Sequence, residues 1–251
     1  MPDGLLEMTT VTTTTSSRVS LRKRTKKQFY VGLTLFMVAI VLIGFWPSYF
    51  GPLLRGRADR PPIIQLHGVV FVGWMALLVV QVILAARGNI RRHRIVGNWG
   101  IAYGCLVLTM GLVASFAAPI IHLRAGEWDR DRAAAFLLTP LGDMVLFGSF
   151  FGAAVAFRSR PEIHKRMMVA ATVALLFAAV GRMEYLPIPV LMAIWLSPMA
   201  AGIVHDWATR RSVHPAYIVA TVVLAIAALR IFVDRTPAWL AISRPVIDAL
   251  R

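Results

Sequence analysis

The feature that most constrains this chain is a series of long apolar runs. Several approach or exceed the ~20 consecutive apolar residues that an α-helix needs to cross a bilayer. Only 16% of the residues are charged, compared with roughly a quarter in soluble domains. The sequence therefore predicts an all-α, polytopic membrane bundle with about seven transmembrane helices, at residues 29–50, 64–86, 96–120, 134–157, 164–185, 187–207 and 215–234.

The distribution of Lys and Arg predicts the orientation of the bundle. If the N-terminus is cytoplasmic, sixteen Lys and Arg residues fall in the N-terminal tail and the inside loops, and nine fall outside. Positive residues accumulate in cytoplasmic loops, so this bias favours a cytoplasmic N-terminus and an external C-terminus. The net charge of +15 is then explained by topology and by anionic lipid headgroups at the cytoplasmic face, and nucleic acid is not an expected partner. The expected location is a bacterial inner membrane.

The two ends of the chain are polar enough to be read separately from the spans. Residues 1–28 contain a Thr- and Ser-rich stretch and then "RVSLRKRTKK", which predicts a disordered, basic and uncleaved cytoplasmic tail. The spans then occupy residues 29–234. Residues 235–251 are too short to cross the membrane and are expected to lie in its interface, with Trp239 as an anchor.

One polar stripe runs through the second predicted span. His67, Trp74 and Gln81 recur every seven residues in "HGVVFVGWMALLVVQ", and each such step drifts only about 20° around a helix. An amide in hydrocarbon would lack a hydrogen-bond partner. The stripe is therefore expected to face the interior of the bundle.

Ionisable residues inside the spans are costly and usually face the interior. Asp143 is the deepest of them, and Arg182 is expected at a similar depth on the next span. One interpretation is a structural Asp–Arg pair that locks two helices together. The other is an outward-facing polar pocket that also includes His67 and His122.

The histidines suggest a cofactor, because membrane cytochromes commonly hold b-type haem between two histidines on different helices. "RGNIRRHR" and "RSRPEIHK" share Arg-x5-His at an offset of 71 residues, and they place His93 and His164 in two inside loops. These two form one candidate pair of haem ligands, and His67 with His122 forms another. The alternative is that such histidines meet lipid headgroups or cap helix ends.

Other site chemistries have less support in the sequence. It contains no His-x3-His pair, no carboxylate–histidine cluster at ligand spacing and no Gly-rich phosphate loop, so no non-haem metal site is predicted. No Gly-x-Ser-x-Gly nucleophile motif is present either. Whether the chain is an enzyme stays open.

The segments "HGVVFVGWMALLVVQ", "RRHRIVGNWG" and "RPEIHKRMMVAATVALLFAAVGR" together resemble a group of bacterial multi-pass membrane proteins that has no assigned activity. The shared patterns are H-x6-W-x6-Q, HR-x2-G and HKR-x-M. The resemblance marks a set of characteristic positions: His67, Trp74, Gln81, His93, Arg94, Gly97, His164, Lys165, Arg166, Met168 and Arg182. A more distant likeness is to cytochrome b561-type membrane proteins, which use histidine pairs on a small helical bundle.

Three functions are consistent with these patterns. The first is a redox or haem-associated membrane protein that transfers electrons or senses. The second is a small-molecule or proton-coupled transporter that uses Asp143, Arg182 and His67. The third is a structural or assembly subunit that binds another membrane protein.

Overall fold

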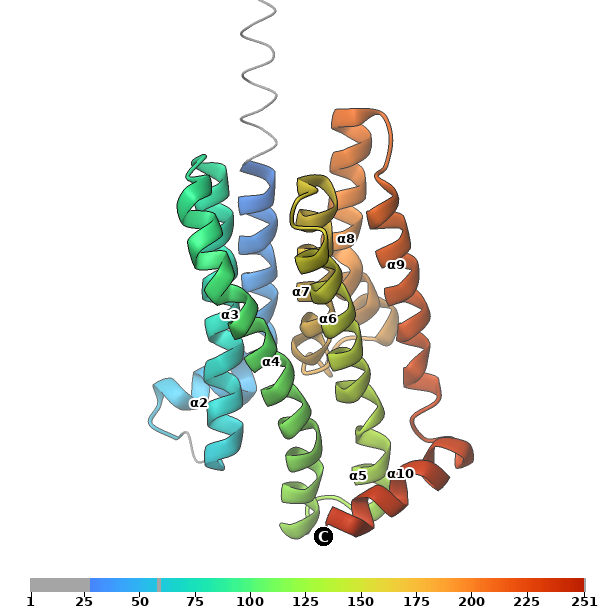
Figure 1. Ribbon diagram of the computed structural model, residues 1–251. Coiled ribbons are helices and arrows are strands. Elements are labelled where there is room, and N and C mark those ends of the chain that lie inside the picture. Colours follow the sequence, from blue (N-terminus) through green and yellow to red (C-terminus); the bar gives the residue numbers. More distant parts are fainter. Residues whose placement is uncertain (1–27, 58–59, 251) are drawn as a thin grey trace, which may run out of the picture.

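The chain forms a bundle of long apolar helices (Figure 1). The computed structural model describes residues 28–57 and 60–250, so the tail predicted at 1–28 lies almost wholly outside the described residues. Within those residues every regular element is helical, and seven segments are long and apolar enough to cross a membrane. The predicted all-α membrane bundle with seven spans is confirmed.

Some spans contain more than one element. The first helix begins at Gln28 and runs through η1 (Trp46–Phe50) and α2 (Gly51–Leu54), and the fourth span joins α5 (Arg130–Phe136) to α6 (Leu138–Ala156). The seventh span is α9 (Pro215–Ala228) followed by η2 (Leu229–Phe232). The other spans are single helices: α3 (Pro62–Ala86), α4 (Ile90–Arg124), α7 (Pro161–Val180) and α8 (Ile188–Arg210).

Consecutive spans run in opposite directions, so the connections gather at two ends (Figure 1). We call the end where the first helix begins the N-terminal end; it carries the α3–α4, α6–α7 and α8–α9 connections. The far end carries α2, the α4–α5 connection and α10 (Pro237–Leu250). Each of the predicted inside loops therefore lies at the N-terminal end.

The fifth span ends five residues earlier than predicted. It was expected to continue to residue 185, but α7 ends at Val180 with Gly181 as its C-cap. The next helix, α8, has Pro187 as its N-cap, and a residue that precedes proline is pushed out of the helical region. The segment between them, which contains Arg182 and Glu184, is therefore a connection rather than a last helical turn.

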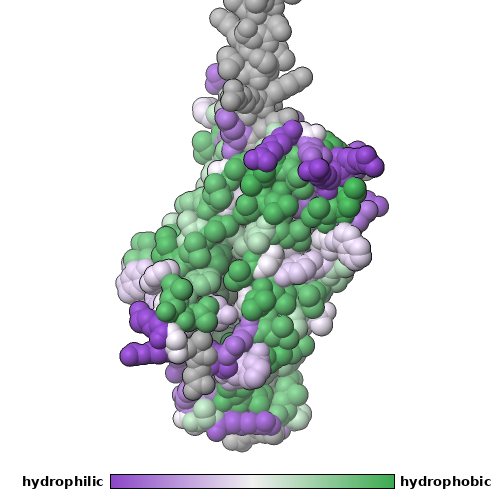
Figure 2. Space-filling view, turned by 90° about the vertical axis from the view of Figure 1, so that its left-hand side faces the viewer, coloured by the Kyte–Doolittle hydropathy of each residue, from purple (hydrophilic) through white to green (hydrophobic). Residues whose placement is uncertain are grey.

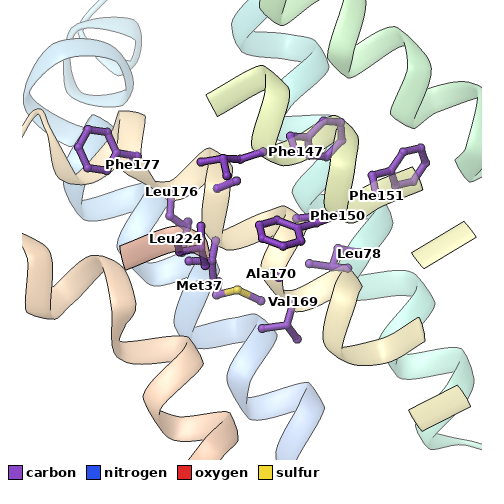
Figure 3. Packing of buried hydrophobic residues seen from close by; sticks show 14 of the residues in the cluster. Met37, Leu78, Phe147, Phe150, Phe151, Val169, Ala170, Leu176, Phe177 and Leu224 are labelled. Carbon is purple, nitrogen blue, oxygen red and sulfur yellow. The ribbon is translucent and has the colours of Figure 1, made fainter. Parts of the chain in front are cut away.

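Helix α7 lies at the centre of the bundle. In its most apolar 18-residue stretch 67% of the residues are buried, more than in any other of the seven spans. It packs against α6, α8 and α9, and its buried side chains meet residues of the first helix, α3, α6 and α9 in the main hydrophobic cluster (Figure 3). Small side chains allow this crowding, since Ala170, Ala171 and Ala174 are fully buried.

The segment after the seventh span folds back onto the bundle. Helix α10 lies across the far end and packs against α5 (Figure 1). Arg244 pairs with Asp131 at 2.7 Å, Arg130 pairs with Asp248, and the indole N–H of Trp239 donates to the carbonyl of Ala134 at 3.1 Å. Beyond its predicted role as an interfacial anchor, Trp239 thus joins α10 to α5.

The surface agrees with a membrane-spanning bundle. Figure 2 shows one face on which hydrophobic residues form a broad middle region, whereas hydrophilic residues gather toward the two ends. Large apolar side chains such as Val145, Val204 and Ile226 are more than 60% exposed. Burial of such residues in a bilayer explains why they need no cover from the protein itself.

Candidate functional site

Two helical hairpins carry the predicted histidine motif in the same way. Asn89 is the N-cap of α4 and Arg160 is the N-cap of α7. His93 and His164 each stand four residues later, where their backbone N–H groups donate to the carbonyls of these N-cap residues at 3.0 Å. The shared spacing in the two loops therefore places both histidines in the first turn of the second helix of a hairpin.

The fold brings these two histidines together. The ring centroids of His93 and His164 are 6.4 Å apart, and the ring planes are nearly perpendicular at 85°. Both side chains are only partly buried. The pair lies at the N-terminal end of the bundle, which carries the α3–α4 and α6–α7 connections (Figure 1).

In both histidines, Nδ1 contacts a backbone carbonyl of the helix that comes before the histidine's own helix in the chain. The Nδ1 atom of His164 lies 2.8 Å from the carbonyl oxygen of Ala154 on α6. The Nδ1 atom of His93 lies 3.3 Å from the carbonyl oxygen of Gln81 on α3. Since Nδ1 is engaged in each ring, Nε2 is the nitrogen left for a ligand, and such outer contacts are how proteins orient metal-binding imidazoles.

Gln81 also reaches the pair with its side chain. Its carboxamide nitrogen donates to the carbonyl oxygen of His93 at 3.1 Å and lies 2.6 Å from His93 Nδ1, and its oxygen accepts from the N–H of Gly97 at 2.7 Å. A Cβ at Gly97 would stand 3.4 Å from this amide, so glycine leaves the amide close to the α4 backbone. Three positions marked by the resemblance thus meet in space.

Trp74 occupies the middle of the predicted stripe. Only 2% of it is exposed, and its ring lies edge-on to Phe147 and Phe151, with centroids 5.2 and 5.6 Å away. The indole N–H has no hydrogen-bond partner among residues 28–57 and 60–250. Trp74 is therefore packed into the interior as the stripe predicts, with aromatic contacts rather than a polar neighbour.

His67 and His122, the second candidate pair, have separate partners. The His67 ring lies 4.1 Å from the ring of Phe71, and its buried Nδ1 atom has no hydrogen-bond partner among the residues that the structure describes. His122 lies 2.5 Å from the carboxylate of Glu127 and stacks on Trp128 at 4.3 Å. The structure brings His93 and His164 together, whereas His67 and His122 each contact other residues.

The partner of Asp143 is not the one that was expected. Arg230 of η2 donates to the Asp143 carboxylate, and both side chains are buried. Arg182 is exposed in the α7–α8 connection, where its guanidinium lies 4.2 Å from the centroid of Phe45 and donates to the carbonyl of Ala178 at 2.6 Å. The reason is that α6 packs against α9 and η2, which puts Arg230 beside Asp143.

A second buried ion pair was missed by the sequence analysis. The Arg166 guanidinium donates to both carboxylate oxygens of Asp206, at 2.5 to 3.0 Å, and each side chain is only 1% exposed. Asp206 is an acid within a predicted span, and that position is itself a signal that an intramembrane partner exists. Arg166 follows His164 by two residues, so this pair fixes α7 against α8 beside the histidines.

The histidine pair is not part of a larger cluster of metal-binding side chains among the described residues. Within the part of the chain that the structure describes, no three His, Cys, Asp or Glu side chains gather in a way that could hold a metal ion. The arrangement therefore offers two imidazole nitrogens. No described protein family, no curated protein and no solved structure matches this chain.

Proposed function

We propose that this protein is a redox-associated membrane protein that holds a b-type haem between His93 and His164, for electron transfer or sensing. The observation that carries the proposal is the convergence of two imidazoles, from two separate hairpins, at a centroid distance of 6.4 Å. The likeness to cytochrome b561-type proteins is part of the same proposal.

The distance between the two rings is compatible with two histidines that bind one iron. A metal–nitrogen bond is about 2 Å long, so ring centroids 6.4 Å apart leave room for a metal ion between the two imidazoles. The contacts at Nδ1 come from α3 and α6, and they leave Nε2 of each ring as the coordinating atom. The donor set also fits, because histidine is a common protein ligand of haem iron.

The chain itself would supply binding and orientation. A bound haem provides one-electron redox chemistry. His93 and His164 would hold its iron, and the cationic side chains of the same two connections, such as Arg94 and Arg158, would pair with its propionate carboxylates. The Arg166–Asp206 pair would keep the first turn of α7, and therefore His164, in place.

The proposal includes a place in the cell. The N-terminal end, with its sixteen Lys and Arg residues in the tail and inside loops, would face the cytoplasm of a bacterium and its anionic lipid headgroups. The histidine pair would then lie near the cytoplasmic side of the inner membrane.

A haem titration tests the proposal. Ferric haem added to the purified protein in detergent should give a Soret band with a low-spin, six-coordinate spectrum at one haem per chain. His93→Ala and His164→Ala should each lose the low-spin form, whereas the matched control His122→Ala, at the other end of α4, should retain it. A titration that gives the same spectrum for the protein and for both pair variants would contradict the proposal.

A second function has one specific observation in its favour. Arg230 is buried next to Asp143, yet its Nε and Nη1 atoms have no hydrogen-bond partner within the described residues. A buried cation with open donors beside a carboxylate is typical of substrate or proton pathways in membranes. We propose as the alternative a proton-coupled or small-molecule transporter that uses this pair.

The transporter proposal is tested at Asp143. Asp143→Asn keeps the size of the side chain but removes its charge, so proton-coupled uptake into proteoliposomes should fall to background while the protein stays folded. Asp248→Asn, at the exposed α10 ion pair, is the control and should transport normally. Full uptake by Asp143→Asn would count against the alternative.

A further inference from the structure

The two histidine hairpins differ at the positions that surround the rings. The 71-residue offset that aligns His93 with His164 also aligns Gln81 with Gly152 and Gly97 with Met168. A Cβ at Gly152 would have no atom within 4 Å. Only the α3–α4 hairpin therefore brings a carboxamide next to its histidine.

The ring of His164 is held in one protonation form by a backbone carbonyl. Its Nδ1 lies 2.8 Å from the carbonyl oxygen of Ala154. A carbonyl oxygen can only accept, so Nδ1 of His164 carries the proton and donates it. A neutral imidazole carries one ring proton, and Nε2 of His164 is consequently a free lone pair.

The orientation of the Gln81 carboxamide is determined by groups other than the ring. The N–H of Gly97 can only donate, so the atom 2.7 Å from it is the carboxamide oxygen. The carbonyl of His93 can only accept, so the atom 3.1 Å from it is the carboxamide nitrogen. Both contacts place the NH2 group 2.6 Å from His93 Nδ1.

This NH2 group requires an acceptor at His93 Nδ1. The competing partner is the backbone carbonyl of Gln81, which would need a proton on Nδ1, but it is farther away at 3.3 Å. A proton on Nδ1 would also point at the NH2 group, donor against donor, at the shorter distance. The neutral His93 ring therefore carries its proton on Nε2.

We propose that Gln81 is a positioning residue that makes the two histidines unequal: it holds neutral His93 with the proton on Nε2, while Ala154 holds His164 with the proton on Nδ1. His164 then presents a lone pair at Nε2 and is the ligand that is ready to bind. His93 becomes a ligand only after the Gln81 carboxamide rotates by half a turn, which moves its oxygen to Nδ1–H and breaks its contact with Gly97. The statement about ligands rests on the proposed haem function; the statement about protons does not.

The proton positions can be measured without any cofactor. In haem-free, ¹⁵N-histidine-labelled protein in lipid nanodiscs, the ¹⁵N shifts should show protonated Nε2 in His93 and protonated Nδ1 in His164. Gln81→Leu should move the His93 proton to Nδ1, because the backbone carbonyl of residue 81 then becomes its nearest partner. Gly152→Leu, the same new side chain at the aligned position, should change neither ring. A proton on Nδ1 of His93 before the substitution, or an unchanged His93 ring after it, would overturn the proposal.

Haem binding gives a second readout. Gln81→Leu should raise the fraction of six-coordinate haem at limiting concentration and strengthen binding roughly tenfold, the low end of the effects of outer contacts on metal affinity. Weaker six-coordinate binding in Gln81→Leu would overturn the ligand order. If the ring protons lie where expected but no variant binds haem, the positioning role of Gln81 would be supported and the proposed haem function would be rejected.

Discussion

His93 and His164 lie with their ring centroids 6.4 Å apart, and the buried carboxylate of Asp143 pairs with Arg230 of η2. The proximity of His93 and His164 could be predicted, because both follow the same loop pattern and lie at the same membrane end. The partner of Asp143 could not, because depth in the membrane does not distinguish α7 from η2, and Arg230 is 87 residues away in the chain. Ion pairs between distant segments need the packing of the helices as well as their positions.

His214 provides a test at the same scale. Its Nδ1 accepts from the N–H of Ala216 at 3.1 Å and so caps α9. Burial, together with the charges of Arg166 and Arg210, lowers the pKa of His214 below its ordinary value of 6.5. The folded state thus prefers the neutral ring, and this contribution to stability is present above about pH 6.5 and is lost as the pH falls through the lower folded-state pKa.

His214→Asn should remove this contribution while it keeps a side-chain acceptor at the cap. Histidines titrate between neutral pH and about pH 5. Over that range, we expect the thermal midpoint of the unmodified protein to fall by more than the thermal midpoint of the variant. The measurement is thermal unfolding in detergent across that range. Equal losses in the two proteins would show that His214 does not contribute to the acid sensitivity.

Among the elements, α7 is the one whose role could not be read from the sequence. Its span was predicted, but seven apolar helices all have lipid-compatible surfaces, and the hydrophobic pattern does not say which one is central. The structure identifies α7 by burial on nearly every side. Its end was also misplaced, since the turn at Gly181 follows an apolar run with no polar break before it.

Close packing around α7 predicts a sharp difference between two alanines. Ala174 is fully buried, whereas Ala178 is exposed on the same helix. Ala174→Leu should destabilise the bundle by about 1–3 kcal/mol, because a crowded interior has no space for the added carbons. Ala178→Leu adds the same carbons at the surface and should change the stability little. Denaturation in mixed micelles measures both variants; equal stabilities would contradict the central position of α7.

For the whole molecule, the membrane made the number of spans predictable and left their arrangement open. Every backbone polar group in hydrocarbon must be satisfied within its own helix, so long apolar runs have few alternatives. Which helices become neighbours depends on small residues and close approaches. Gly44 is an example, because a Cβ there would stand only 2.2 Å from the carbonyl oxygen of Ala179.

We propose that two hairpins distant in the sequence together hold a haem. The most direct test of this proposal is the reduced-minus-oxidised visible spectrum of the full-length protein, purified from cells supplied with haem. We expect a Soret difference and a sharp α-band, and we expect the double variant with His93→Ala and His164→Ala to lose both. A spectrum without either band, or bands that persist in that double variant, would contradict the proposal.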